Sequence, residues 1–494
     1  MRKITRQPLF NFPMLLKIVG MLLLIECAFL LIPLVTGLIY HERDAFTIGA
    51  TALGTCLAGL LLSRGIRPTH TRLSKRDGFL LTSFVWVAFS LFGMLPFIFS
   101  KSTPCTVTDA FFEAMSGFTT TGASTLGNRP EMSNCLLMWR AVMQWIGGLG
   151  IILFTLAVIP MLNTRGGMQM FNAEMTGITH DKIRPRISQT AKSLWGVYAI
   201  LTIMLTLLLY LGPMSFFDAL CTAFGTVSTG GYTSGIAGIE AMQHAYVKAV
   251  MTVFMFLGGV NFALIFRLIT GQPKQLIRND VFRIYIKFIG VMWMCFAIAG
   301  LVSDGYNGPV RLLLDPLFQV VAISTSTGIS LLPVAGWGGF TLILTMVMMF
   351  FGGCAGSTSG GAKIDRMVYL FKNIRNELYR CIYPNAVLPV QVGGRVASPQ
   401  LVGKVVAFLC IYVLVVLIGA AILTIMNVPF VDAFFSCFSC ICNTGFGTDI
   451  TGLGESYDML PFAAKWVLSL IMLIGRLEVF SVLVLLLPSF WRRG

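Results

Sequence analysis

The sequence predicts an all-α polytopic membrane protein, and three observations support this fold class. The 494 residues are 56% hydrophobic and only 12% charged, whereas soluble proteins contain about 25% charged residues. The mean hydropathy is +0.81. The apolar residues also form runs of the length that a helix needs to cross a bilayer, about 20 residues. These features exclude an ordinary soluble enzyme and a disordered or collagen-like chain.

Ten apolar runs are long enough to span a membrane. The first run is too long for a signal-peptide core and lacks a small-x-small cleavage site, so we expect it to remain a helix. The predicted spans are residues 15–40, 46–62, 79–99, 136–162, 190–211, 246–269, 283–303, 338–372, 402–426 and 461–490.

The positive charges lie mainly on one side of these spans. Most of the 36 Lys and Arg residues fall in alternate loops and at both chain ends, and the positive-inside rule places that side in the cytoplasm. The net charge of +15 therefore indicates topology and not nucleic-acid binding. The basic loops 163–192 and 363–404 could bind anionic lipid or an acidic protein surface.

Four outer loops share one pattern, in which a Gly follows an Asp thirteen positions later. The pairs are Asp109 and Gly122, Asp218 and Gly231, Asp315 and Gly328, and Asp432 and Gly445. Each loop lies between two spans, so the chain contains four units of span, re-entrant segment and span. Two spans return the chain to the same side, so all four units share one orientation and can surround an axis along the membrane normal.

This repeat divides the chain into five parts. We expect a two-helix transmembrane hairpin at its N-terminal end, followed by four pore units around a central pathway. The predicted boundaries are 1–78 for the hairpin and 79–187, 188–278, 279–400 and 401–494 for the four units.

The residue types within each re-entrant segment predict a short helix and then a strand. Asp suits a helix start, as an N-cap and beside the positive end of the helix dipole. About ten mostly apolar residues follow, enough for a helix that crosses half of the bilayer. The Ser, Thr and Gly residues after it favour extended or left-handed backbone. Four such strands would present rings of carbonyl oxygens, which can replace the hydration shell of a monovalent cation.

At these residues the chain resembles the Trk/Ktr/HKT superfamily of potassium transporters, most closely the TrkH/TrkG-type membrane subunit of bacterial uptake systems. The resemblance covers essentially the whole chain and includes the motifs TTTGAS, STGGYT, GGCAGSTSGGAK and GRLEVF. It implies a filter with a glycine from each unit, and glycine at all four positions implies potassium selectivity. The implied potassium-binding residues are Thr120, Thr121, Gly122, Thr229, Gly230, Gly231, Ser326, Thr327, Gly328, Asn443, Thr444 and Gly445.

The eighth span contains five glycines in its middle, each of which costs a helix about 1 kcal/mol relative to Ala. We therefore expect an unwound segment at residues 352–363, although close helix packing through small residues is an alternative. The resemblance implies that this segment gates ion passage. The implied gating residues are Gly352, Gly353, Gly356, Ser357, Thr358, Ser359, Gly360, Gly361 and Lys363.

Arg476 lies inside the last span, where a charge is costly unless it is paired or hydrated. The resemblance implies that it belongs to the gate, below the filter and beside the glycine-rich segment. The competing interpretation is a local pair with Glu478 or a lipid headgroup.

The resemblance implies potassium uptake across the bacterial cytoplasmic membrane, with both termini inside, potassium as substrate and no covalently bound cofactor. It also implies a homodimer and a cytosolic TrkA-type regulatory subunit that binds a nucleotide, ATP/ADP or NAD. A potassium/proton symporter on the same fold is the alternative, with Glu26 and Glu478 as candidate proton sites. An enzyme is not expected, because the spans contain no Ser/His, paired-Asp or HExxH set.

Overall fold

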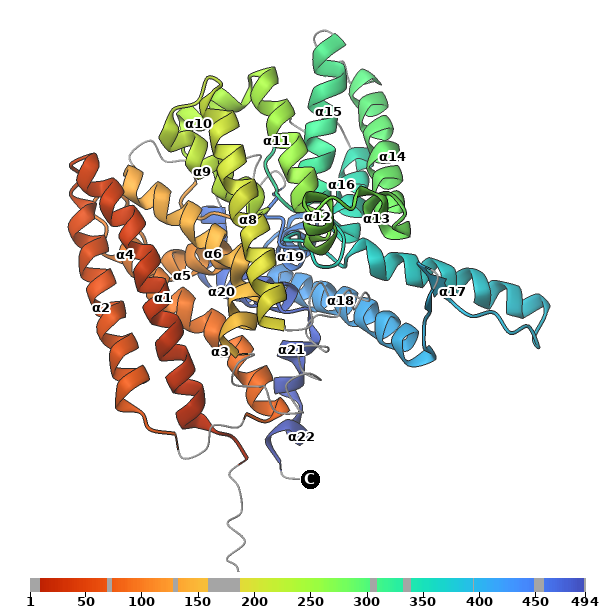
Figure 1. Ribbon diagram of the computed structural model, residues 1–494, viewed down its shortest axis with the longest axis horizontal. Helices are drawn as coiled ribbons and strands as arrows, with labels where there is room; N and C mark the ends of the chain where they lie inside the picture. The colour runs from red at the N-terminus through yellow and green to blue at the C-terminus, as the bar shows by residue number, and fades with distance from the viewer. Residues whose placement is uncertain are drawn as a thin grey trace, which may run out of the picture.

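The computed structural model describes residues 9–68, 73–127, 132–158, 187–302, 309–331, 339–393, 395–447 and 457–492. Within these ranges the chain is helical apart from turns, loops and one antiparallel pair of short strands, β1 (Gln391–Val392) and β2 (Arg395–Val396). The helices form a single cluster from which α17 (Ile364–Ile382) extends to one side (Figure 1).

The first two helices form the predicted N-terminal hairpin. Helices α1 (Phe12–Ile39) and α2 (Asp44–Gly65) run along one flank of the molecule (Figure 1). They approach closely through small residues, since a Cβ at Gly20 would lie 2.6 Å from the Cβ of Leu62. Helix α1 also contacts α3 and α6 of the first unit, so the hairpin covers that unit.

The remaining helices form the four predicted units, each with a pore helix between two longer segments. Unit 1 comprises α3 (Lys75–Gly93), α4 (Leu95–Ile98), α5 (Val107–Phe118) and α6 (Asn134–Val158). Unit 2 comprises α8 (Ile187–Tyr210), α9 (Phe216–Val227), α10 (Ile236–Met242), α11 (Ala245–Gly258), α12 (Phe262–Ile269) and α13 (Pro273–Ile277).

Units 3 and 4 follow the same plan. Unit 3 comprises α14 (Asp280–Val302), α15 (Pro309–Ser324), α16 (Gly339–Phe351), α17 and the two strands. Unit 4 comprises α18 (Pro399–Ile425), α19 (Phe430–Ile441), η2 (Tyr457–Met459), α20 (Phe462–Arg476), α21 (Phe480–Leu483), η3 (Val484–Leu486) and α22 (Pro488–Trp491). The pore helices are α5, α9, α15 and α19.

The four units close into a ring in chain order. After each pore helix, the next helix of more than ten residues packs against the pore helix of the following unit: α6 on α9, α11 on α15, α16 on α19, and α20 on α5. The last of these contacts joins unit 4 to unit 1. The fourfold arrangement expected from the Asp–Gly spacing is therefore confirmed.

Two predicted spans are wrong as continuous helices. Residues 246–269 form α11 and α12, which meet at 110°, and residues 461–490 contain a bend of 112° after α20. The first break follows Gly258, and the second contains Glu478 and Val479 in left-handed backbone, with φ of 55° and 56°. Six helices in the described ranges are long and apolar enough to cross a bilayer, or eight if each bent pair counts as one span.

The break predicted in the eighth span is present. Helix α16 ends at Phe351, and α17 begins at Ile364, so residues 352–363 form a loop. We call residues 352–363 the glycine-rich loop. Units 2, 3 and 4 thus interrupt the segment after the pore helix, whereas α6 of unit 1 continues through Gly147 and Gly148.

The expected N-cap role of the repeated aspartates is wrong. Thr106 and Ser215 cap α5 and α9, and each hydroxyl accepts from the backbone N–H of the Asp three residues later. Asp432 is likewise the third residue of α19. Asp315 lies inside α15, which begins at Pro309. Except in α15, the carboxylate still lies in the first turn, where its negative charge interacts favourably with the positive end of the helix dipole.

Candidate ion pathway

Each pore helix ends with the same backbone turn. In unit 1 the N–H of Thr120 donates to Gly117 O at 3.0 Å, and the N–H of Thr121 donates to Ser116 O at 2.9 Å. These two bonds define a Schellman motif, which reverses the chain direction at a helix end. The corresponding bonds occur at Thr229 and Gly230, at Ser326 and Thr327, and at Asn443 and Thr444.

The residue at the centre of each turn has left-handed backbone although none is glycine. The φ angles are 53° for Thr120, 55° for Thr229, 55° for Ser326 and 51° for Asn443. This conformation is rare for β-branched residues and costs about 1–3 kcal/mol. Its occurrence at one position in all four units means that the surrounding packing holds four equivalent segments, residues 120–122, 229–231, 326–328 and 443–445. These are the segments that the sequence predicts as the filter, and we call them the filter strands.

The filter strands form a closed ring of carbonyl groups. A Cβ at Gly122 would lie 2.2 Å from Gly230 O, one at Gly231 would lie 2.0 Å from Thr327 O, and one at Gly328 would lie 1.9 Å from Thr444 O. A Cβ at Gly445 would lie 2.2 Å from Thr121 O, which closes the circle. Two separate reasons therefore require glycine at each of these positions: the backbone has a positive φ, and the carbonyl group of the neighbouring unit leaves no space for a Cβ.

A cavity of about 200 Å³ lies directly above this ring. All four filter glycines contribute to its wall, together with residues that follow them in each unit, such as Ser124, Tyr232, Ser330 and Phe446. The ring therefore opens to a space large enough for several water molecules.

The glycine-rich loop packs on the opposite side of the filter strands and contacts three units. The N–H of Gly361 donates to Cys442 O at 3.0 Å, and the Thr358 hydroxyl donates to Val227 O at 3.1 Å. The N–H of Gly360 donates to the hydroxyl of Ser326, a filter residue of the loop's own unit. Within the loop, Gly353 N–H donates to Ser359 Oγ at 2.9 Å, Ser357 Oγ donates to Cys354 O at 2.6 Å, and Lys363 Nζ donates to Ser359 O.

The same loop pairs with the break between α11 and α12. Cys354 N–H donates to Gly259 O at 2.8 Å, and Phe262 N–H donates to Gly356 O at 3.0 Å. Asn261 Nδ2 donates to Ala355 O at 2.8 Å. The loop thus satisfies backbone groups that the interrupted helix leaves exposed, as irregular backbone at membrane depth requires.

Arg476 lies below the filter and contacts the glycine-rich loop. Its Nη1 donates to Thr358 O at 3.1 Å, and its Nη2 donates to Gly147 O of unit 1 at 2.9 Å. Glu478 instead forms an ion pair with Arg366, with 2.6 Å between Nη2 and Oε2. The local Arg476–Glu478 pair that we weighed as an alternative is therefore not the arrangement present.

The sequence matches the TrkH family, described as cation transport protein, over residues 45–299 and 309–493. The chain belongs to this family. The Trk system potassium uptake protein TrkH of Escherichia coli (strain K12) is 36% identical over 487 residues, covering 98% of this chain and 100% of the relative. TrkG of the same organism is 30% identical over 478 residues, covering 96% of this chain and 97% of the relative.

A solved TrkH-family structure supports the same assignment. The crystal structure of the potassium transporter TrkH from Vibrio parahaemolyticus matches with a TM-score of 0.88 and 32% sequence identity, covering 98% of this chain and 100% of the other. The predicted membership and helical membrane fold are both confirmed. The relatives are transport proteins, in agreement with the prediction that the chain is not an enzyme.

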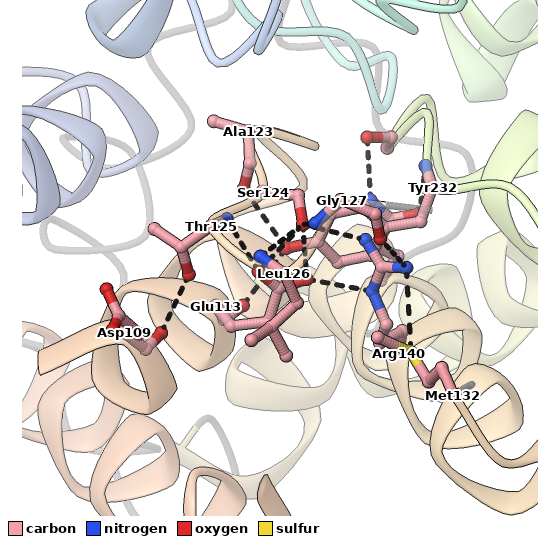
Figure 2. Close-up of polar contacts among 12 residues, drawn as sticks. Asp109, Glu113, Ala123, Ser124, Thr125, Leu126, Gly127, Met132, Arg140 and Tyr232 are labelled. Carbon is pink, nitrogen blue, oxygen red and sulfur yellow. Dashed lines mark hydrogen bonds and ion pairs between the residues drawn. The ribbon is translucent and has the colours of Figure 1, made fainter. Parts of the chain in front are cut away.

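A buried ion pair beside the filter of this TrkH-family chain was not predicted. Arg140 on α6 donates through Nε to Glu113 Oε1 at 2.8 Å, and both side chains are almost fully buried. Figure 2 shows Glu113 among the groups that follow the filter strand: Ser124 Oγ donates to it at 3.0 Å and Thr125 N–H at 3.1 Å. The pair therefore anchors the chain where it leaves the filter of unit 1.

Two further ion pairs join neighbouring units at their outer ends. Lys248 Nζ lies 2.7 Å from Asp315 Oδ1, and Lys465 Nζ lies 2.6 Å from Asp109 Oδ1. Burial alone would raise the pKa of Asp109, but hydrogen bonds from Lys465 and Thr106 more than offset this and hold the pKa below its usual range. These two repeated aspartates thus link units instead of presenting unpaired negative charge to the outside.

Cys105 and Cys135, which flank the first pore loop, are both free thiols. The basic loop predicted at 163–192 lies mostly outside the described residues.

Proposed function

We propose that this chain carries potassium into the cell through a potassium-selective filter built from its four filter strands. The observation that supports this most strongly is the ring in which each filter glycine packs on the carbonyl group of the next unit. Carbonyl oxygens arranged in this way can replace the water around a monovalent cation. The name of the E. coli relative, a potassium uptake protein, supports potassium as the cation.

The potassium-binding residues in this proposal are the twelve residues of the filter strands. The carbonyl groups of Thr121, Gly230, Thr327 and Thr444 form one ring of ligands around the axis. The four pore helices end at this level, so their negative C-terminal ends favour a cation there without any charged side chain. Carbonyl oxygens at this level would replace the water that the ion loses.

The glycine-rich loop acts as the gate in this proposal, with Gly352, Gly353, Gly356, Ser357, Thr358, Ser359, Gly360, Gly361, Lys363 and Arg476 as its functional residues. It donates hydrogen bonds to Ser326 of one filter strand and to Val227 and Cys442, which precede two others. Arg476 holds the loop through Thr358 and places a positive charge beside the path, which opposes cation entry until the loop moves. Opening then requires that these few hydrogen bonds break together.

The wider setting also belongs to the proposal. The chain lies in the bacterial cytoplasmic membrane with both termini in the cytoplasm, divided into units at the boundaries predicted from the sequence. It pairs with a second copy and is controlled by a cytosolic TrkA-type subunit that binds the nucleotide, whereas the chain itself carries no covalent cofactor. The basic charge of the cytoplasmic loops and the word "system" in the names of the relatives support this.

The positions of the two candidate proton sites favour a gated pathway over a potassium/proton symporter. Glu478 is engaged in an ion pair with Arg366. Glu26 is buried in α1, within the hairpin outside the four units. Neither carboxylate lines the cavity above the filter.

The test is rubidium flux into proteoliposomes that contain the purified full-length chain, with and without a proton gradient. We expect rubidium and potassium to exchange readily and sodium poorly. Once the membrane potential is clamped, the rubidium flux should be the same with and without the proton gradient. Flux that requires the proton gradient would favour the symporter. Equal sodium and potassium flux would contradict the assignment of the filter.

A further inference from the structure

The residue before the filter glycine differs in one unit. It is threonine at positions 121, 327 and 444, and glycine at position 230. In unit 1 the threonine side chain holds the strand to its own pore helix: Thr121 Oγ1 lies 2.8 Å from Thr119 Oγ1, which donates to Met115 O at 2.7 Å.

Unit 3 repeats this arrangement with the same distances. Thr327 Oγ1 lies 2.8 Å from Thr325 Oγ1, which donates to Val321 O at 2.7 Å. Since the hydroxyl hydrogen of Thr325 is used on the helix carbonyl, the filter threonine is the donor of the pair. Unit 2 cannot make this contact, because glycine has no side chain.

In unit 2 a side chain from the neighbouring unit occupies this place. Gln144 on α6 of unit 1 donates through Nε2 to Gly230 O at 2.6 Å, and its Oε1 accepts from Tyr232 N–H at 3.1 Å. The amide therefore holds the backbone on both sides of the filter glycine, Gly231. Gln144 is fully buried, so both bonds lie where an unpaired polar group would be costly.

Space, and not backbone conformation, requires glycine at position 230. Its φ angle is outside the left-handed range, so other residues could adopt this backbone. A Cβ there, however, would lie 2.4 Å from Cδ of Gln144. Unit 2 also retains a hydroxyl, Ser228, at the position that corresponds to Thr119 in unit 1. Gln144 and Gly230 are thus complementary, and together they replace a filter threonine.

The carbonyl group that Gln144 contacts belongs to the filter ring, since a Cβ at Gly122 would lie 2.2 Å from Gly230 O. A carbonyl oxygen has two lone pairs, so one N–H can fix its direction while the other lone pair still faces the axis. The direction of these oxygens decides how closely they surround a cation, and hence how well the ring distinguishes cations of different radius.

We propose that Gln144 is a positioning residue of the selectivity filter, which sets the direction of the Gly230 carbonyl in the unit that lacks the threonine side chain by which units 1 and 3 hold their filter strands to the pore helix. The proposal rests on the proposed function as a potassium-selective pathway. It assigns part of the selectivity of unit 2 to a side chain of unit 1.

The first test is Gln144→Leu, which keeps the approximate side-chain volume and removes both hydrogen bonds. Rubidium and sodium fluxes are measured in proteoliposomes for the full-length chain and the variant. We expect the potassium-over-sodium preference to fall by about tenfold, the value of one such interaction, with rubidium flux retained. The matched control is Met143→Leu, since Met143 is the preceding buried residue of α6 and packs on Gly117 instead of on a filter strand.

An unchanged preference in Gln144→Leu would overturn the proposal, and so would an equal loss of rubidium and sodium flux, which indicates a purely structural role. If the unmodified chain itself shows no potassium preference, the proposed function fails, and this inference fails with it.

The second test replaces the Gln144–Gly230 contact of unit 2 with a filter threonine like that of unit 1, and it does not leave a void in the core. Gly230→Thr alone should lose flux and selectivity, because its side chain would overlap Gln144. The double variant Gln144→Ala with Gly230→Thr should recover most of both, since the new threonine can donate to Ser228. A double variant no better than Gly230→Thr alone would overturn the proposed complementarity.

Discussion

At the level of the candidate filter all four units contribute the same backbone, whereas directly beneath it unit 3 alone supplies the glycine-rich loop, which packs against units 2 and 4. The filter strands share their Schellman turns, their left-handed residues and their glycine-to-carbonyl contacts. Among the described residues, the corresponding breaks in units 2 and 4 are only the short segments 259–261 and 477–479, and α6 of unit 1 is unbroken, so no other unit has a loop of this length. An ion that is bound from all sides requires equivalent groups in all four units, whereas one obstruction is enough to close a path. The filter strands can therefore be fourfold symmetric while the glycine-rich loop beneath them is not.

The largest expected effect tests the equivalence of the filter glycines. Replacing Gly122, Gly231, Gly328 or Gly445 singly by Ala places a Cβ against a carbonyl of the next unit, and overpacking of this kind costs up to about 3 kcal/mol. We expect rubidium flux to fall by about a hundredfold in each variant. Gly196→Ala is the control, because no atom lies within 4 Å of the added group. Losses that differ greatly between units would contradict the fourfold equivalence.

The next effect concerns the asymmetric layer. Arg476→Ala removes the donors to Thr358 O and Gly147 O together with the charge beside the path. We expect flux in the absence of any regulatory subunit to rise by about tenfold, since charged hydrogen bonds contribute about 1.5–3 kcal/mol. Arg476→Lys keeps the charge and should show a smaller rise. Basal flux that stays at the parent value in Arg476→Ala would refute the proposed gate.

A smaller change should follow from Thr358→Val, which preserves shape and removes the hydroxyl that contacts Val227 O and Gly258 O. The loss of about 1 kcal/mol should increase basal rubidium flux about fivefold without altering the potassium-over-sodium preference. A change in preference would mean that the loop and the filter are not separate layers. Thr206→Val serves as the control, because the Thr206 hydroxyl donates to Thr202 O within α8.

The smallest effect concerns stability at the outer ends of the units. Lys465→Met should lower the midpoint of thermal unfolding by a few degrees at about pH 7, because it leaves the buried Asp109 carboxylate without its partner. Since the pKa of folded Asp109 is lowered, the pair stabilises the fold above the unfolded value of about 3.9. This contribution is lost as the pH falls through the lower folded pKa. The two proteins should therefore converge in strong acid, and a constant difference would contradict the ion pair.

The ring could be predicted from the sequence because its signal is a recurrence. One Asp–Gly spacing appears four times between apolar spans, and two spans per unit allow only a common orientation. The glycine-rich loop was also predictable, since five glycines would together cost a continuous helix about 5 kcal/mol.

The remaining features depend on contacts between segments distant in the chain. The break after α20 involves Glu478 and Val479 in left-handed backbone, residues that by themselves give no sign of a turn. The break after α11 begins at two glycines, but the loop of unit 3 satisfies its backbone groups. In the sequence Gln144 is one polar residue within a span. Its role could not be predicted, because it depends on the space that Gly230 leaves in another unit.

Each filter glycine contacts the next unit in chain order, and Gly445 of unit 4 contacts unit 1. The contact between units 4 and 1 is therefore the last that can form during synthesis. Asn443 donates to Thr121 Oγ1 across 322 residues of sequence, and Gly445 meets the Thr121 carbonyl beside it. The ring can therefore close only after synthesis has passed Gly445 of the 494 residues. A chain truncated before Asn443 holds three of the four filter strands and cannot close the ring.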